Sequence, residues 1–226
     1  MAVNKEKYQQ IHEELRLLKI TLVAVSKTKP IEDILELYDL GHRDFGENYV
    51  QELAEKAESL PKDIRWHFIG HLQSNKVKYI APFIHLIHGV DSGKLLEEIN
   101  KQAIKNNRVI DCLLQVYIAG EETKFGLDEN ELVDLFNQPP AANARICGLM
   151  GMASFSDNME IVRSEFKYLK TLFDKLSLRG TKQQPQPINH KLEILSMGMS
   201  SDYHIAIEEG SNMVRIGSLL FGARNV

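Results

Sequence analysis

The sequence predicts an α/β fold, a (β/α)₈ barrel of the TIM type. Short apolar segments and amphipathic helical patterns alternate eight times along the chain. Each apolar segment is too short and too uniformly apolar to leave one face in solvent, as is typical of parallel strands covered on both faces. An open doubly wound sheet is the runner-up, but no Gly-x-Gly-x-x-Gly motif follows the first strand to support dinucleotide binding. We expect residues 1–226 to form one domain, since 43% hydrophobic residues suffice for a core.

The expected elements follow from hydrophobic periodicity and from capping residues. A helix is predicted first, over residues 4–18, where Tyr8, Ile11, Leu15 and Leu18 form one apolar stripe. The first strand begins at Thr21, and seven more are expected at 43–46, 65–69, 84–90, 109–116, 145–150, 192–196 and 213–217. Helices are expected at 30–40, 49–59, 74–80, after Asp91 as N-cap, after Asp128 in a capping box, at 159–176 and at 200–209. A full eighth helix does not fit into residues 218–226, so we expect the N-terminal helix to fill that gap.

Composition excludes several classes of function. The net charge is −4 with a pI of about 6.1, and the basic residues are scattered, which argues against nucleic-acid binding. No apolar run approaches the ~20 residues that span a bilayer, and the N-terminus lacks the apolar core of a signal peptide. We therefore expect a cytoplasmic protein without membrane contact. Cys112 and Cys147 lie in apolar strands and are expected to be reduced thiols.

Lys27 and Lys29 follow the first strand, at the end where barrels carry their chemistry. Alternation along a strand places Lys27 on the same face as Val23 and Val25, so its amine points into the space that the apolar face lines. The alternative is that both lysines are solvated charges closing the strand, as most lysines are. Lys29 has a possible supporting role: a nearby cation and burial favour the neutral amine of Lys27, which is the form that attacks an aldehyde.

Small and hydroxyl residues follow the last two strands, with Ser200 after strand seven and Gly217 and Ser218 after strand eight. Barrels commonly bind phosphate there, on free backbone N–H groups at the start of a short helix. Ordinary helix capping by Ser200 or Ser201 is the alternative. Asp202 must point away from any bound phosphate.

Arg215 lies between two apolar residues of strand eight, and alternation is compatible with an inward orientation. An inward lysine, an inward arginine and a phosphate cradle together describe a pocket for pyridoxal 5′-phosphate. Lys27 would form the Schiff base with the cofactor aldehyde, and Arg215 would face the ring nitrogen. Because arginine only donates hydrogen bonds, the ring nitrogen would stay unprotonated and the cofactor would be a weaker electron sink.

Five motifs in order carry a resemblance that runs nearly end to end. They are Val25-Ser-Lys-Thr-Lys-Pro30, Phe45-Gly-Glu-Asn-Tyr-Val-Gln-Glu52, Trp66-His-Phe-Ile-Gly-His-Leu-Gln-Ser-Asn-Lys76, Leu195-Ser-Met-Gly-Met-Ser200 and Val214-Arg-Ile-Gly-Ser-Leu-Leu-Phe-Gly-Ala-Arg224. The chain resembles the pyridoxal phosphate homeostasis (YggS/PROSC) family. The resemblance implies a fold type III barrel similar to the N-terminal domain of alanine racemase.

The resemblance also implies roles for particular residues. It gives Lys27 as the cofactor lysine, Arg215 at the pyridine nitrogen, and Ser200, Gly217 and Ser218 at the phosphate. Asn48 and His67, at the ends of strands two and three, are expected to line the pocket. No carboxylate or thiolate cluster accompanies His67 and His71 in the sequence, so no metal site is expected.

Three functions remain open at this point. The first is a non-enzymatic protein of intracellular pyridoxal phosphate homeostasis, which holds the cofactor reversibly and passes it to apo-enzymes. The racemases resembled here add a second domain and a partner subunit, whereas this sequence stops at the barrel, so we expect an incomplete catalytic constellation and a monomer. The second is a small pyridoxal-phosphate-dependent amino-acid racemase. The third is a barrel for another phosphorylated metabolite, in which Lys27 is only an ion-pair partner.

Overall fold

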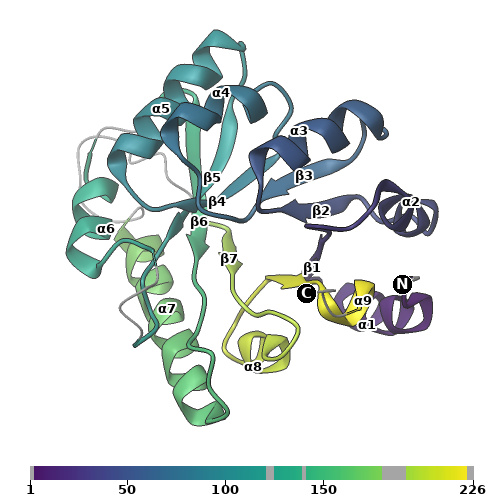
Figure 1. Cartoon of the computed structure of the whole chain (residues 1–226). Coiled ribbons are helices and arrows are strands. Elements are labelled where there is room, and N and C mark those ends of the chain that lie inside the picture. Colours follow the sequence, from purple (N-terminus) through teal and green to yellow (C-terminus); the bar gives the residue numbers. More distant parts are fainter. Residues whose placement is uncertain (1–2, 121–124, 139–140, 180–191, 223–226) are drawn as a thin grey trace.

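Eight parallel strands close into a barrel in the order of the sequence. The computed structural model describes residues 3–120, 125–138, 141–179 and 192–222 (Figure 1). The strands are β1 (Thr21–Val25), β2 (Asp44–Glu47), β3 (Arg65–Phe68), β4 (Leu86–Val90), β5 (Ile110–Gln115), β6 (Ala144–Met150), β7 (Ile194–Ser196) and β8 (Met213–Ile216). The predicted (β/α)₈ architecture is therefore confirmed.

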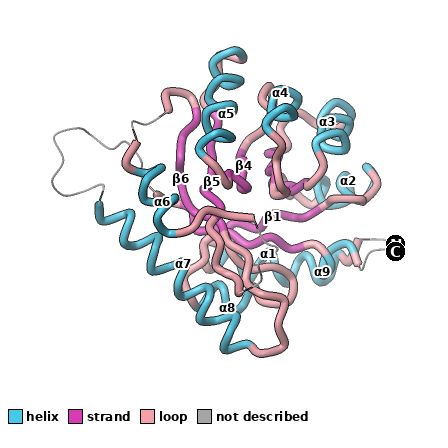
Figure 2. Tube along the Cα trace, turned by 60° about the vertical axis from the view of Figure 1, so that its left-hand side comes forward, coloured by secondary structure: helices cyan, strands magenta, loops and turns pink. Residues whose placement is uncertain are grey.

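Helices surround the strands on the outside, as both views show (Figures 1 and 2). They are α1 (Lys5–Leu17), α2 (Ile31–Asp39), α3 (Val50–Ser59), α4 (Val77–Ile80), α5 (Gly93–Lys105), α6 (Glu129–Phe136), α7 (Met159–Arg179), α8 (Tyr203–Glu208) and α9 (Ser218–Phe221). A 3₁₀ turn, Ser74–Lys76, occupies the first part of the helix predicted at 74–80. No helix in the described ranges is both long and apolar enough to span a membrane.

Two caps were predicted before these helices, and one of the predictions is wrong. The capping box at Asp128 is present, because its side chain accepts from the backbone N–H of Glu131 while the Glu131 side chain accepts in return. The N-cap of α5 is Ser92 and not Asp91, since the Ser92 hydroxyl oxygen accepts from the N–H of Leu95. Asp91 instead lies 2.9 Å from a ring nitrogen of His71.

Helix α1 fills the gap in the outer ring beside α9 and β1, as predicted. The backbone N–H of Asn4 donates to the carbonyl of Leu220 at 2.8 Å, which ties the start of α1 to α9. Tyr8, Ile11 and Leu15 are buried, whereas Leu18 is 53% exposed. The prediction for Leu18 was wrong because the helix ends at Leu17, and beyond that residue the helical period no longer sets the direction of side chains.

The barrel wall separates two apolar regions. The larger packs between the strands and the helices and includes Ala24 and Phe45. A smaller one, inside the barrel, is formed by Val23, Leu86, Leu113, Cys147, Met150 and Met213. Val23 and Ala24 thus face opposite sides of β1, so the predicted alternation of this strand is correct. Cys112 and Cys147 are buried free cysteines, as expected.

Replacing Leu15 by alanine is expected to lower the free energy of unfolding by about 2–5 kcal/mol, because Leu15 is fully buried where α1 covers the barrel. Leu17→Ala is the matched control within the same helix. Leu17 is 69% exposed, so its replacement should change stability by less than about 0.5 kcal/mol. Urea unfolding of both variants measures the difference. Equal effects would contradict the assignment of α1 to the outer ring.

Candidate functional site

A cavity of about 600 Å³ opens at the carboxyl-terminal ends of the strands. Segments that follow β1, β2, β3, β6, β7 and β8 contribute to its wall. All the residues predicted as a site except His67 line this cavity. They are Lys27, Asn48, Ser200, Arg215, Gly217 and Ser218. A volume of this size is typical of small-molecule sites, and its position is the one that barrels use for chemistry.

Hydrogen bonds from backbone N–H groups hold the turn that carries Lys27. Lys29 N–H donates to the carbonyl of Ser26 at 3.0 Å, and Thr28 N–H donates to Oε1 of Glu52 at 2.6 Å. Thr28 has a φ of 62°, in the left-handed region that a β-branched residue rarely adopts. Such backbone strain persists only where the surroundings impose it. The direction in which Lys27 leaves β1 is therefore fixed by contacts on both sides of it.

A buried ion pair lies beneath this turn. The Lys56 amine donates to the carbonyl of Ser26 at 2.8 Å, to Oε1 of Glu47 at 2.8 Å and to Oε1 of Glu52 at 2.6 Å. The hydroxyl of Ser26 also donates to Oε1 of Glu47, at 2.6 Å. Burial raises the pKa of Glu47, although the Lys56 charge opposes the shift. The pair joins the end of β1 to β2 and α3.

Arg215 points into the barrel mouth, as predicted, and is only 4% exposed. Its Nη1 donates to the hydroxyl oxygen of Ser196 at 2.6 Å, and its Nη2 donates to the carbonyl of Gly151 at 3.0 Å. Burial lowers the pKa of Arg215 to about 10. The guanidinium is therefore still charged at neutral pH, and it lines the same cavity as Lys27.

Ser200 connects the last two segments of the cavity wall, because its hydroxyl oxygen accepts from the N–H of Gly217 at 3.2 Å. The helix predicted to begin at residue 200 begins at Tyr203, so Ser200 lies in the preceding turn and does not cap it. Oδ1 of Asp202 accepts from the N–H of Met199 at 2.5 Å. Asp202 is not among the residues that line the cavity, so its carboxylate is turned away as the sequence required.

Asn48 lines the cavity and carries a buried acceptor that is unpaired among the described residues. Its Oδ1 is buried and has no hydrogen-bond partner within the described part of the chain. Buried polar atoms are almost always paired, and an exception at a functional site is usually satisfied by a ligand or a water molecule. Asn48 therefore fits a ligand that carries a hydroxyl or another donor.

His67 does not line the cavity, and the expectation that it would is wrong. It is 1% exposed and lies inside the barrel, where its Nδ1 is 2.9 Å from Nε2 of His88 and its Nε2 is 3.1 Å from Oδ1 of Asp44. Since β3 ends at Phe68, the inward position at the mouth belongs to Ile69. His67 precedes Ile69 by two residues and therefore lies one layer deeper.

His67 in β3 and His85, which directly precedes β4, do have a carboxylate nearby, which sequence reasoning missed. Asp44, His67 and His85 bring their ligand atoms within 4.8 Å of one another. However, the two carboxylate oxygens of Asp44 accept from Arg65 at 2.7 and 2.5 Å. A guanidinium therefore already occupies the position from which Asp44 would bind a cation. The contact follows from the register of β2 against β3, which places Asp44 opposite Arg65 and which the pattern of either strand alone does not contain.

Comparison with known proteins places the chain in a family. The family model described as alanine racemase, N-terminal domain, matches residues 4–225, so the barrel is of this class. A pyridoxal phosphate homeostasis protein of Aquifex aeolicus is 45% identical over 205 residues, which cover 90% of this chain and 86% of the relative. The human protein of the same name is 38% identical over 239 residues, covering 99% and 85%. The chain therefore belongs to the family of pyridoxal phosphate homeostasis proteins.

Solved structures agree with this assignment. PipY of Synechococcus elongatus, with pyridoxal phosphate bound, superposes with a TM-score of 0.83 at 32% identity and covers 96% of this chain and 99% of its own. Alanine racemase of Bartonella henselae has a TM-score of 0.66 at 19% identity, and the match covers 97% of this chain but 60% of the racemase. The second likeness concerns the barrel fold alone.

Replacing Lys56 by methionine is expected to cost about 3–5 kcal/mol of stability at neutral pH, because Glu47 then keeps a buried charge without a positive charge beside it. Burial raises the folded-state pKa of Glu47 above its unfolded value, so the folded state binds the proton more tightly. The loss should therefore shrink as the pH falls through the folded-state pKa. Urea unfolding between pH 5 and 8 measures this.

Lys101→Met is the control for this variant, since the Lys101 side chain is 63% exposed, and it should change stability by less than about 0.5 kcal/mol. Glu47→Gln in the Lys56→Met background should restore most of the loss. A loss for Lys56→Met that does not depend on pH would contradict the assignment to Glu47.

Proposed function

We propose that this protein binds pyridoxal 5′-phosphate reversibly and holds it on Lys27, as a cytoplasmic protein of cofactor homeostasis. The observation that carries the proposal is that Lys27, Arg215 and Ser200 face one cavity of about 600 Å³. The family supports it, because its members are named for pyridoxal phosphate homeostasis and PipY was solved with this cofactor bound. The protein acts as a monomer in this proposal.

The residues at the cavity fit the cofactor group by group. The Lys27 amine is the residue for covalent attachment, and Arg215 is the donor for the ring nitrogen. The hydroxyls of Ser200 and Ser218 and the backbone of Gly217 suit the phosphate. The unpaired Oδ1 of Asn48 suits a hydroxyl donor. When bound, the cofactor supplies an aldehyde that reacts with amines and a ring that withdraws electrons.

A carrier fits the cavity better than an enzyme does. The ionisable side chains that line it, within the described residues, are Lys27, Lys29 and Arg215, without a carboxylate, histidine, cysteine or tyrosine. The Lys29 amine donates to the carbonyl of Phe221 at 2.7 Å. Removal of a substrate proton needs a positioned base, and racemisation also needs an acid on the opposite face. Phe155, at the cavity wall, is 92% exposed, so the cavity remains accessible for transfer to an apo-enzyme.

Borohydride reduction of the cofactor-loaded protein is expected to leave the label on Lys27. Lys27→Ala should abolish the visible absorbance band of the lysine-bound cofactor, because Lys29, the other lysine at the cavity among the described residues, is held by the carbonyl of Phe221. Lys29→Ala is the control and should keep the band, with a changed pH dependence of attachment if Lys29 favours the neutral amine of Lys27. Absorbance spectra and peptide mapping measure both results. A label on Lys29 would correct the attachment site, and a wild-type protein without a specific band would favour another phosphorylated metabolite.

The loaded protein is expected to leave the Cα proton of free amino acids in place, because among the described residues at the cavity Lys27 holds the cofactor and the Lys29 amine is bonded to a carbonyl, which leaves no acid and base pair. Deuterium exchange at Cα, followed by NMR over a panel of amino acids, should not exceed the rate with free cofactor. Exchange above that rate would support the racemase alternative. Transfer of labelled cofactor to an apo-enzyme faster than its spontaneous release would support the delivery role.

A further inference from the structure

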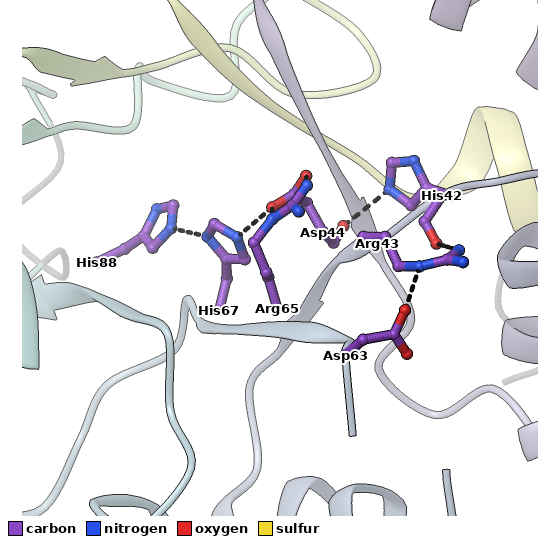
Figure 3. A network of polar contacts seen from close by, with 7 residues as sticks. All are labelled: His42, Arg43, Asp44, Asp63, Arg65, His67 and His88. Carbon is purple, nitrogen blue, oxygen red and sulfur yellow. Dashed lines mark hydrogen bonds and ion pairs between the residues drawn. The ribbon is translucent and has the colours of Figure 1, made fainter. Parts of the chain in front are cut away.

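A continuous row of polar side chains crosses the barrel interior from its amino-terminal mouth to the cavity. Figure 3 shows the first part, in which His67 lies between His88 and the pair of Asp44 and Arg65. The row continues because Nδ1 of His88 lies 3.2 Å from the hydroxyl of Ser196. That hydroxyl accepts from Arg215.

Hydrogen-bond chemistry fixes the direction of this row. The Asp44 carboxylate only accepts, so Nε2 of His67 carries a proton, whereas the Ser196 oxygen accepts from Arg215 and has its own proton available for Nδ1 of His88. A neutral His88 then carries its proton on Nε2 and donates to Nδ1 of His67. His67 in turn carries its proton on Nε2 and donates to the carboxylate of Asp44. Each group from Arg215 to His67 thus donates a hydrogen bond to the next group along the row, and Asp44 accepts the last one.

Burial and charge agree with this direction. His88 is completely buried, and burial together with the charges near it lowers its pKa well below the usual value, so the ring is neutral. Burial alone would raise the pKa of Asp44, but hydrogen bonds from Arg65 and His67 outweigh it and hold the pKa low. The row therefore ends on a carboxylate whose low pKa keeps it ionised at neutral pH.

We propose that Asp44 is a positioning residue for Arg215, which it orients and polarises through Ser196, His88 and His67 although it lies at the opposite mouth of the barrel. The proposal rests on the proposed function, since Arg215 is there the donor for the cofactor ring nitrogen. Hydrogen bonds that run in one direction polarise one another, so the carboxylate strengthens the acceptor that Ser196 offers to Arg215. The guanidinium is thereby fixed before the cofactor arrives.

The same residues do not favour a metal ion. Asp44 accepts two hydrogen bonds from Arg65, whose guanidinium would repel a cation, and His67 uses both of its ring nitrogens within the row. The Asp44 carboxylate and the His67 ring are therefore already engaged in these hydrogen bonds.

The first experiment tests the direction of the row in the cofactor-free protein. Nitrogen-15 NMR of the imidazole rings distinguishes the two neutral tautomers of each histidine. We expect the Nε2–H tautomer for both His67 and His88. An Nδ1–H tautomer at His88, or a charged His67, would reverse the row and overturn the proposal, whether or not the protein binds pyridoxal phosphate.

The second experiment compares two ion pairs of the same kind. Asp44 aligns with Arg65 and Asp111 aligns with Arg145, and in each pair the arginine donates twice to the carboxylate, but only Asp44 contacts the row. Asp44→Asn keeps an acceptor for His67 and removes the charge. It should weaken binding of pyridoxal phosphate about threefold and shift the pH at which the bound cofactor changes its absorbance. Asp111→Asn should leave affinity within about twofold and the pH unchanged.

Ser196→Ala interrupts the row next to Arg215 and is a second variant, should Asp44→Asn fail to fold. It should weaken binding about tenfold, which corresponds to about 1.4 kcal/mol. Equal effects of Asp44→Asn and Asp111→Asn, or an unchanged absorbance and affinity in Ser196→Ala, would overturn the proposal. If the wild-type protein binds no pyridoxal phosphate, the proposed function fails, and the tautomers of the histidines still decide the direction of the row.

Discussion

The pairing of β1 with β8 is the contact on which the site depends. These strands meet in register over four pairs of residues, from Thr21 with Met213 to Ala24 with Ile216. The pairing closes the sheet, so the segment that follows β1 comes to lie beside the segment that follows β8. The hydrogen bond from Lys29 to Phe221 spans 192 positions of sequence and exists only because of this closure. Without the pairing of β1 with β8, Lys27 and Arg215 would lie at opposite edges of an open sheet.

The closed barrel also creates an interior that must be filled, and this protein fills it with two kinds of side chain. Apolar residues such as Val23, Leu113 and Met150 pack on one part. The polar row from Asp44 to Arg215 occupies another. Buried polar groups cost several kcal/mol when unpaired. The described members of this row are paired at each step, and the arginine at one end of it, Arg215, lies at the cavity.

The fold was predictable because it depends on patterns that repeat. Eight alternations of short apolar strands and helices required covered parallel strands, and the shortage of residues after β8 required α1 in the outer ring. The positions of Lys27, Arg215 and Ser200 at one cavity followed from the same rule, since barrels gather the carboxyl ends of their strands.

The parts that sequence reasoning missed depend on where elements end and how neighbouring strands align. His67 was expected at the cavity as a residue at the end of strand three, but β3 continues beyond it to Phe68, and His67 lies one layer below Ile69. The contact of Asp44 with His67 depends on the register of β2 against β3, which periodicity within each strand does not contain. Leu18 and the cap at Ser92 were misplaced for a similar reason, because a single residue at a helix end decides which side chain faces inward or caps.

Two features near the cavity cost free energy in the folded protein. Oδ1 of Asn48 is buried without a partner among the described residues, and Thr28 is held in the left-handed region. The Lys56 amine and the Ser196 hydroxyl meanwhile fix the turn of Lys27 and the guanidinium of Arg215 from below. Groups fixed in advance lose little entropy on binding, and an orphaned acceptor gains a partner. A ligand that donates a hydrogen bond to Asn48 would therefore stabilise the folded state by mass action.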